Sequence, residues 1–147
     1  MKRLIWAAAA ALVVAGVAHA AKPPITAQPL GTGQLAKTVT LNAKPGDLTF
    51  VQAKVQPGGN FGWHIHRAPV AVAVVGGTLT LYDSSDPKCR ATRVPAGRAF
   101  VEQPNHVHLA RNEGKTPVRL LIVYLGAPHG ESPDAAALPP AQCSAVK

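Results

Sequence analysis

The chain is poor in acidic and aromatic residues. Seven of its 147 residues are Asp or Glu, fifteen are Lys or Arg, and aromatic residues make up 5% of the sequence. Such sparse carboxylates argue against isomerases and hydrolases that need a carboxylate base. The basic residues are spread along the chain without interleaved aromatics, so a nucleic-acid-binding groove is not indicated.

The sequence signatures of several enzyme classes are also missing. There is no glycine-rich phosphate loop, no dinucleotide fingerprint, no CxxC pair and no Ser–His–Asp motif. No stretch after residue 20 shows a long apolar repeat of 3.6 residues, which argues against a helical domain. These absences favour a β-rich domain whose chemistry depends on side chains other than carboxylates.

The apolar run at the N-terminus is too short for a typical membrane span. Residues 4–17 are almost wholly apolar, follow Lys2 and Arg3, and precede Ala18-His19-Ala20. This order predicts a secretory signal peptide over residues 1–20 and a secreted or periplasmic protein whose net charge falls from +8 to +6 on cleavage. An uncleaved membrane anchor is the alternative, although a spanning helix needs about 20 apolar residues. After cleavage, no membrane contact is expected.

Two cysteines, Cys89 and Cys143, are present. In an exported protein an even number of cysteines indicates a disulfide. This bridge would close a loop of about 55 residues, worth about 4 kcal/mol in the chain-entropy estimate, and would hold the C-terminal segment to the middle of the domain. Metal ligation by the cysteines is the weaker alternative, because neither stands in a CxxC or CxxH spacing.

Short runs rich in Val, Leu, Thr and Phe alternate with clusters of Pro, Gly, Asn and Asp. This pattern predicts an all-β sandwich or barrel over residues 38–126, preceded by a flexible lead-in, residues 21–37, and followed by a Pro- and Ala-rich tail, residues 127–147. The predicted strands cover residues 38–43, 48–55, 61–66, 70–75, 78–83, 90–94, 99–102, 106–111 and 118–125.

Two histidine pairs, His64/His66 and His106/His108, each have one residue between the histidines. Alternate residues of a strand point to the same face, so each pair can direct two imidazoles at one point. Imidazole is a common ligand of Zn, Cu, Fe and Ni. Two such strands facing each other therefore predict a metal site.

The residues around these histidines resemble the two sequence motifs of the cupin family. The first motif, G(x)5HxH(x)3,4E(x)6G, is matched by Gly58, His64, His66 and Gly77, with Val70 at the glutamate position. The second motif, G(x)5PxG(x)2H(x)3N, is matched by Gly97, His108 and Asn112, with Gln103 and Asn105 in place of Pro and Gly. The resemblance covers about residues 45–125.

This resemblance implies an antiparallel jelly-roll barrel that holds a metal. The implied ligands of a divalent transition metal (Fe, Zn, Cu, Ni or Mn) are His64, His66 and His108. Val70 cannot ligate a metal, but three imidazoles with open positions suffice for catalytic zinc and for some non-haem iron centres. The resemblance also implies a small-molecule ligand or substrate and a homodimer.

Two residues are candidates for the ligand that Val70 does not supply. His106 lies two positions before His108 and would share its face on a straight strand; the alternative places His106 in a turn, facing solvent or substrate. Glu102 is the one acidic residue within the span of the second motif. It is a substitute ligand or a general base if it points inward, and a strand residue outside the site if it does not.

The tyrosines and Val70 are candidates for lining the pocket. The motif places Val70 at the site, and Tyr82 and Tyr124 either line the mouth of the barrel and bind a ligand or pack as ordinary strand residues. The leading hypothesis is an exported single-domain cupin that binds a divalent transition metal through the three histidines of the motifs. Whether it is an enzyme stays open; an oxygenase is the enzymatic candidate, since that chemistry needs no carboxylate base. The alternatives are a non-catalytic metal- or small-molecule-binding protein and a metal-free structural domain.

Overall fold

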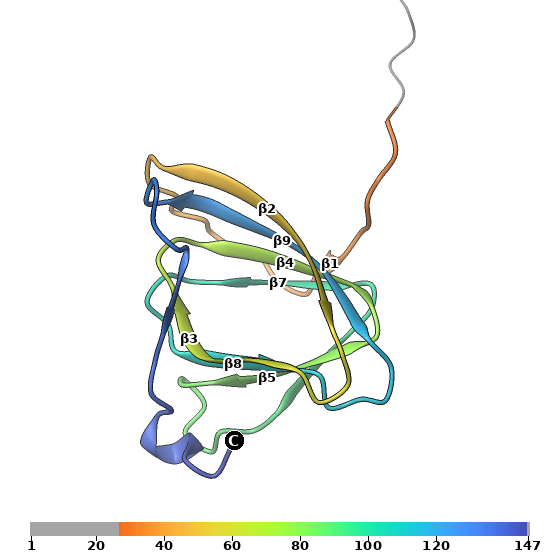
Figure 1. Cartoon of the computed structure of the whole chain (residues 1–147), viewed down its shortest axis with the longest axis vertical. Coiled ribbons are helices and arrows are strands. Elements are labelled where there is room, and N and C mark those ends of the chain that lie inside the picture. Colours follow the sequence, from red (N-terminus) through yellow and green to blue (C-terminus); the bar gives the residue numbers. More distant parts are fainter. Residues whose placement is uncertain (1–26, 147) are drawn as a thin grey trace, which may run out of the picture.

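A computed structural model describes residues 27–146. The predicted signal peptide and the first residues of the predicted lead-in lie outside this range. The described residues form two five-stranded β-sheets that face each other (Figure 1). No helix in this range is both long and apolar enough to cross a membrane.

The first sheet carries the strand order β1–β7–β4–β9–β2. Its pairs are antiparallel, except that β1 runs parallel to β7. The strands are β1 (Gln34–Leu35), β7 (Arg98–Glu102), β4 (Val70–Gly76), β9 (Val118–Ala127) and β2 (Asp47–Val55).

The second sheet carries the strand order β10–β3–β8–β5–β6, with every pair antiparallel. A short 3-10 helix, η1 (Ala141–Cys143), follows its last strand in the chain. The strands are β10 (Asp134–Ala136), β3 (Asn60–His66), β8 (His108–Arg111), β5 (Thr78–Asp83) and β6 (Thr92–Pro95).

The all-β fold class predicted from the sequence is confirmed, although the two sheets do not close into a barrel. Eight predicted strands agree with observed strands to within two residues at each end. The strand predicted over residues 38–43 is wrong: this segment forms no strand, and the preceding β1 is the segment that pairs with the edge of β7. The short strands β1 and β10 were not predicted.

The core lies between the sheets. Alternation along β4 directs Val70, Val72 and Val74 inward, where they are at most 5% exposed. Leu120 and Ile122 on β9 do the same from the neighbouring strand. The inward faces of these strands therefore form an apolar floor beneath the polar residues described below.

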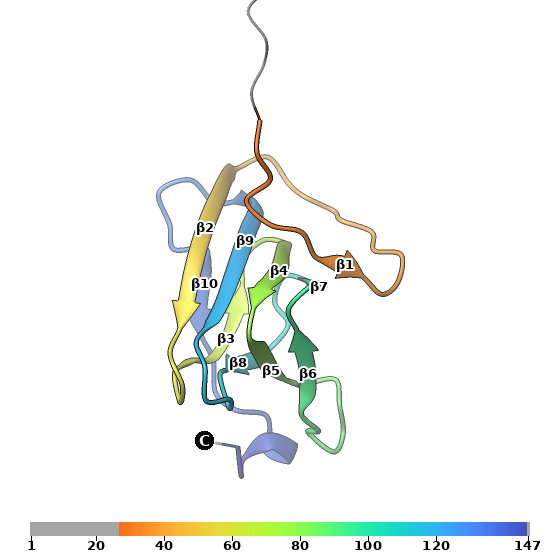
Figure 2. The same cartoon turned by 90° about the vertical axis from the view of Figure 1, so that its right-hand side faces the viewer.

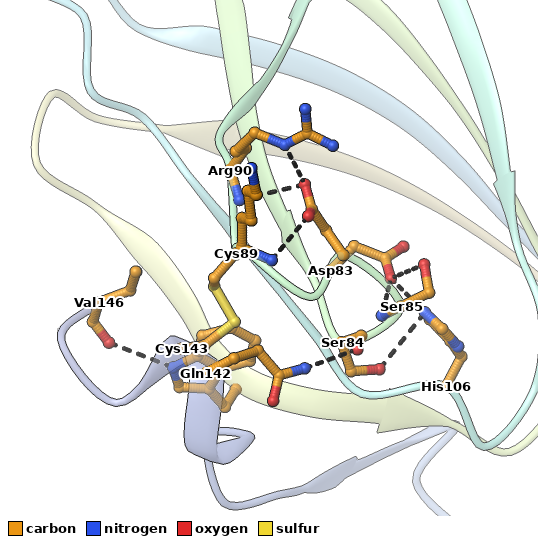
Figure 3. Close-up of a disulfide and its surroundings, with 12 residues drawn as sticks. Asp83, Ser84, Ser85, Cys89, Arg90, His106, Gln142, Cys143 and Val146 are labelled. Carbon is orange, nitrogen blue, oxygen red and sulfur yellow. Dashed lines mark hydrogen bonds and ion pairs between the residues drawn. A yellow bond between two sulfur atoms is a disulfide. The ribbon is translucent and has the colours of Figure 1, made fainter.

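The predicted Cys89–Cys143 disulfide is present, with Cα atoms 5.2 Å apart. It joins the connection between β5 and β6 to η1, where the side chain of Gln142 also donates a hydrogen bond of 2.8 Å to the Ser84 carbonyl (Figure 3). Figure 2 shows the C-terminal segment descending from β9 through β10 to η1. The tail thus crosses the second sheet and is covalently held at its far end.

Candidate metal centre

Three histidines converge between the sheets. His64 and His66 lie on β3, and His108 lies directly opposite His64 on the neighbouring strand β8. The period of two along β3 places both of its histidines on the inner face. All three side chains are buried, and the ligand atoms that they offer lie within 4.8 Å of one another. The residues that the motifs single out therefore meet at one point.

Each of these imidazoles is oriented through its Nδ1 atom. Nδ1 of His64 lies 3.0 Å from the Gly62 carbonyl oxygen, and Nδ1 of His108 lies 2.8 Å from the His106 carbonyl oxygen. Nδ1 of His66 lies 2.6 Å from a carboxylate oxygen of Asp134. Since these oxygens accept, each Nδ1 carries the proton and donates, which leaves Nε2 as the metal-binding atom.

Glu102, at the end of β7, reaches the same point. Its Oε2 lies 2.9 Å from His66 Nε2, and its Oε1 lies 3.2 Å from His108 Nε2. The side chain of Glu102 is 14% exposed. The second contact is close enough for an ion pair but lacks hydrogen-bond alignment, so His108 Nε2 is a buried nitrogen without a hydrogen-bond partner. An unsatisfied buried nitrogen beside a carboxylate suits a metal ion.

The electrostatics of the cluster set His66 and His108 apart. Burial lowers the pKa of His66, but hydrogen bonds and negative charge from Asp134 and Glu102 outweigh burial and raise its pKa from 6.5 to about 9. Burial, together with the neighbouring imidazoles, lowers the pKa of His108 despite the charge of Glu102. Without a metal, a protonated His66 therefore provides the positive charge between the two carboxylates.

Asp134 belongs to a chain of hydrogen bonds that ends at Tyr124. The Tyr124 hydroxyl donates to Oδ2 of Asp134 over 3.0 Å, while Oδ1 accepts from His66. Burial raises the pKa of Asp134, but the hydrogen bond and charge of His66 outweigh it and hold the pKa below its ordinary value. Carboxylates that accept from a ligating histidine fix its ring and increase its basicity.

Sequence reasoning missed Asp134, because it lies in the Pro- and Ala-rich tail, where no strand was predicted. The pairing of β10 with β3 places Asp134 opposite His66. Two backbone hydrogen bonds flank this pairing, from Arg67 N to the Pro133 carbonyl and from Ala137 N to the Trp63 carbonyl. Only the strand register reveals the contact, and the sequence contains no motif that could have predicted it.

Two spaces adjoin the histidines. A small cavity of about 30 Å³ lies between them and the apolar floor, with Val70 and Phe100 in its lining. This is room for a single ion or water molecule. A larger cleft of about 670 Å³ has residues 35–40, Glu102 and His108 in its lining. The cleft gives a small molecule access to the cluster.

The remaining candidate residues lie around the cluster. Val70 is fully buried against it, and Tyr82 lines the cleft while its hydroxyl donates to Glu113 over 2.7 Å. His106 lies outside the cluster: it precedes β8, and its Nε2 atom contacts Oδ1 of Asp83 at 2.6 Å (Figure 3). The rule that residues i and i+2 share a face does not apply to His106, because the strand has not yet begun.

Comparisons with solved structures show the same fold in proteins of low sequence identity. DMSP lyase DddQ from Ruegeria pomeroyi is 17% identical, with 61% of this chain and 43% of the lyase covered and a TM-score of 0.52. A protein with a double-stranded β-helix domain from Klebsiella pneumoniae is 23% identical, with 64% and 77% covered and a TM-score of 0.50. A recombinant oxalate oxidase in complex with glycolate is 25% identical, with 60% and 45% covered and a TM-score of 0.50.

The chain spans less than half the length of the DMSP lyase chains that it resembles. A search of curated proteins finds no match. The family described as the cupin domain matches residues 51–124, which is half of the chain and includes His64, His66, Glu102 and His108. The sequence motifs, the two facing sheets and this match agree, and the protein therefore belongs to the cupin family.

Proposed function

We propose that this protein binds one divalent transition metal through His64, His66 and His108 and acts on a small molecule that enters through the adjoining cleft. The observation that carries the proposal is the convergence of three buried imidazoles whose Nδ1 atoms are all engaged elsewhere. Such an arrangement fixes the rings before a metal arrives, so little conformational freedom is lost on binding.

A metal held by His64, His66 and His108 would keep open coordination positions and would supply Lewis-acid or redox chemistry to a bound molecule. The ligand type suits Fe, Zn, Cu and Ni. The protein's own contribution is to orient the rings, to shield the centre from water with the apolar floor, and to admit a small molecule past Phe100 and Glu102. The Cys89–Cys143 disulfide is consistent with the proposed secretion.

Oxidation is the reaction class that we propose to test first. The carboxylates beside the cluster, Glu102 and Asp134, are both in contact with His66, so neither is a free general base. An oxygenase or oxidase needs no such base. The similarity to an oxalate oxidase with glycolate bound also supports an oxidation of a small polar molecule.

Metal analysis of residues 21–147, produced with one defined metal at a time, tests the metal centre. We expect one equivalent of metal in the wild-type protein and a trace in the His64→Ala/His66→Ala variant. Equal metal contents in the two proteins would refute the centre.

Oxygen uptake by the Fe(II)-loaded protein then tests for catalysis. The substrate panel consists of small diketones, thiols, phenols and 2-hydroxy acids. Turnover that disappears in the double variant supports an oxygen-dependent enzyme. Tight metal binding without turnover, whether the protein is loaded with Fe, Zn, Cu, Ni or Mn, supports the binding-protein alternative instead.

A further inference from the structure

We infer that Glu102 is the carboxylate ligand of this centre and that it replaces, from a neighbouring strand, the glutamate that the first cupin motif places at position 70. The inference rests on the proposed metal-binding function and extends it to a residue that neither motif specifies. It is carried by strand register, by contact distances and by charge.

The register of β4 and β7 places the two positions side by side. Val70 on β4 is the direct antiparallel partner of Glu102 on β7. Directly opposed residues point to the same face of a sheet, with Cβ atoms about 4.5–5.5 Å apart. The Cβ atoms of positions 102 and 70 are therefore neighbours on the same face, and a carboxylate at either position extends toward the same part of the site. Both side chains line the small cavity beside the histidines.

The contact distances suit a shared metal. Neighbouring ligand atoms bound to one metal at about 2.0–2.2 Å lie about 2.8–3.1 Å apart in octahedral geometry, which leaves two positions open beside four protein ligands, and about 3.3–3.6 Å apart in tetrahedral geometry. The two oxygens of Glu102 lie 2.9 Å and 3.2 Å from Nε2 of His66 and His108, respectively. A small adjustment of the side chains thus admits an ion between groups that already face one another.

The burial of Glu102 also favours a cation beside its carboxylate. A carboxylate that is 14% exposed must be compensated by positive charge or by hydrogen bonds. His66 Nε2 lies 2.9 Å from Glu102 Oε2, while His108 Nε2 has no hydrogen-bond partner. A divalent ion would compensate Glu102 and occupy the lone pair of His108 at once. Val70, fully buried and apolar, offers the ion nothing.

Competition with a chromogenic chelator for Zn²⁺, and the visible absorption spectrum of the Co²⁺ form, test this assignment in the chain of residues 21–147. Glu102→Gln keeps the shape of the side chain and removes its charge; we expect at least a tenfold loss of affinity and a shifted Co²⁺ spectrum. The exchange Val70→Glu/Glu102→Val returns the carboxylate to the motif position and should restore most of the affinity. Asp83→Asn, which removes an acid outside the cluster, is the matched control.

The outcomes separate the inference from the proposed function. If the wild-type protein takes up neither Zn²⁺ nor Co²⁺, the metal centre itself is refuted and the ligand assignment falls with it. If the wild type binds both ions and Glu102→Gln matches its affinity and spectrum, the assignment alone is overturned. If the exchange variant folds, as judged by circular dichroism, yet binds no better than Glu102→Gln, the equivalence of positions 70 and 102 is overturned. If it does not fold, Glu102→Gln decides.

Discussion

The two histidine pairs have the same spacing, yet the first delivers two side chains to the centre and the second delivers one. His64 and His66 both lie within β3, so the period of the strand carries both inward. β8 begins at His108, and His106 lies before it, directly after the turn in which Asn105 adopts a φ of +60°. An HxH pattern therefore specifies two ligands only where a strand spans both histidines.

Both pairs also include a histidine that contacts a carboxylate at 2.6 Å, His66 with Asp134 and His106 with Asp83. The surroundings differ. The side chain of His66 is 4% exposed and faces two other imidazoles, whereas that of His106 is 35% exposed and borders the cleft. A carboxylate partner thus orients a histidine but does not by itself make a metal centre; burial and convergence are also required.

The largest expected effect contrasts one histidine from each pair. His66→Ala removes a ligand and should weaken metal binding by more than the roughly 10–100-fold typical for the loss of an outer partner. His106→Ala should leave the affinity unchanged, because its side chain lies outside the cluster. Isothermal titration of the two variants with Zn²⁺ measures both. Comparable losses would show that the second pair contributes two ligands after all.

Removal of the disulfide should lower the free energy of unfolding and have little effect on metal affinity. Cys89→Ala/Cys143→Ala is expected to lower the free energy of unfolding by about 2–4 kcal/mol, since the unfolded chain regains freedom. The bond lies on the His106 side of the molecule, beside Ser84, while β10 is held separately by its pairing with β3 (Figure 3). Urea unfolding and Zn²⁺ titration of the variant test this. A loss of affinity as large as that of His66→Ala would contradict it.

The two carboxylate partners provide a third contrast. Asp134→Asn keeps a hydrogen-bond acceptor for His66 but removes the charge that increases the basicity of the ring, and should weaken metal binding about 10–100-fold. Asp83→Asn makes the same change beside His106 and should have no effect on metal binding. Chelator competition compares the two variants under identical conditions, and equal affinities would contradict a specific contribution of Asp134 to metal binding.

The smallest effect concerns pH in the metal-free protein. The pKa of His66 is about 9, above the value of about 6.5 in an unfolded chain, so its ion pairs stabilise the fold fully below pH 6.5 and are lost as the pH rises through 9. The ratio of the unfolding equilibrium constants of His66→Gln and the wild type should therefore fall by about tenfold between pH 8 and pH 10. Urea unfolding across this range measures it; a constant difference would contradict the raised pKa.

The part of the centre that follows local periodicity could be predicted from the sequence. The motif spacing and the alternation of strand residues were sufficient to select His64, His66 and His108. The inward orientation of Glu102 remained one of two alternatives, because it depends on which residue of β4 lies opposite it. Register between strands is a tertiary property, and a single sequence does not contain it.

The edges of the sheets were the least predictable part of the fold. Residues 38–43 have the composition of a strand, but β-propensity does not reveal whether an unpaired edge is available to them. Conversely, β10 consists of Asp134, Ala135 and Ala136, which have no strand-like composition; it forms because the edge of β3 is open. Both errors have the same cause, the competition of segments for edges.

The addition of β10 to β3 has a consequence for how the protein is shortened or compared with relatives. Asp134 lies beyond residue 124, where the match to the family ends. A truncated chain that stops at residue 126 would retain all three imidazoles and Glu102, yet Nδ1 of His66 would lose Asp134 and donate to water instead. Sequence changes in the tail alone would then change the metal affinity, while the strands that carry the ligands stayed the same.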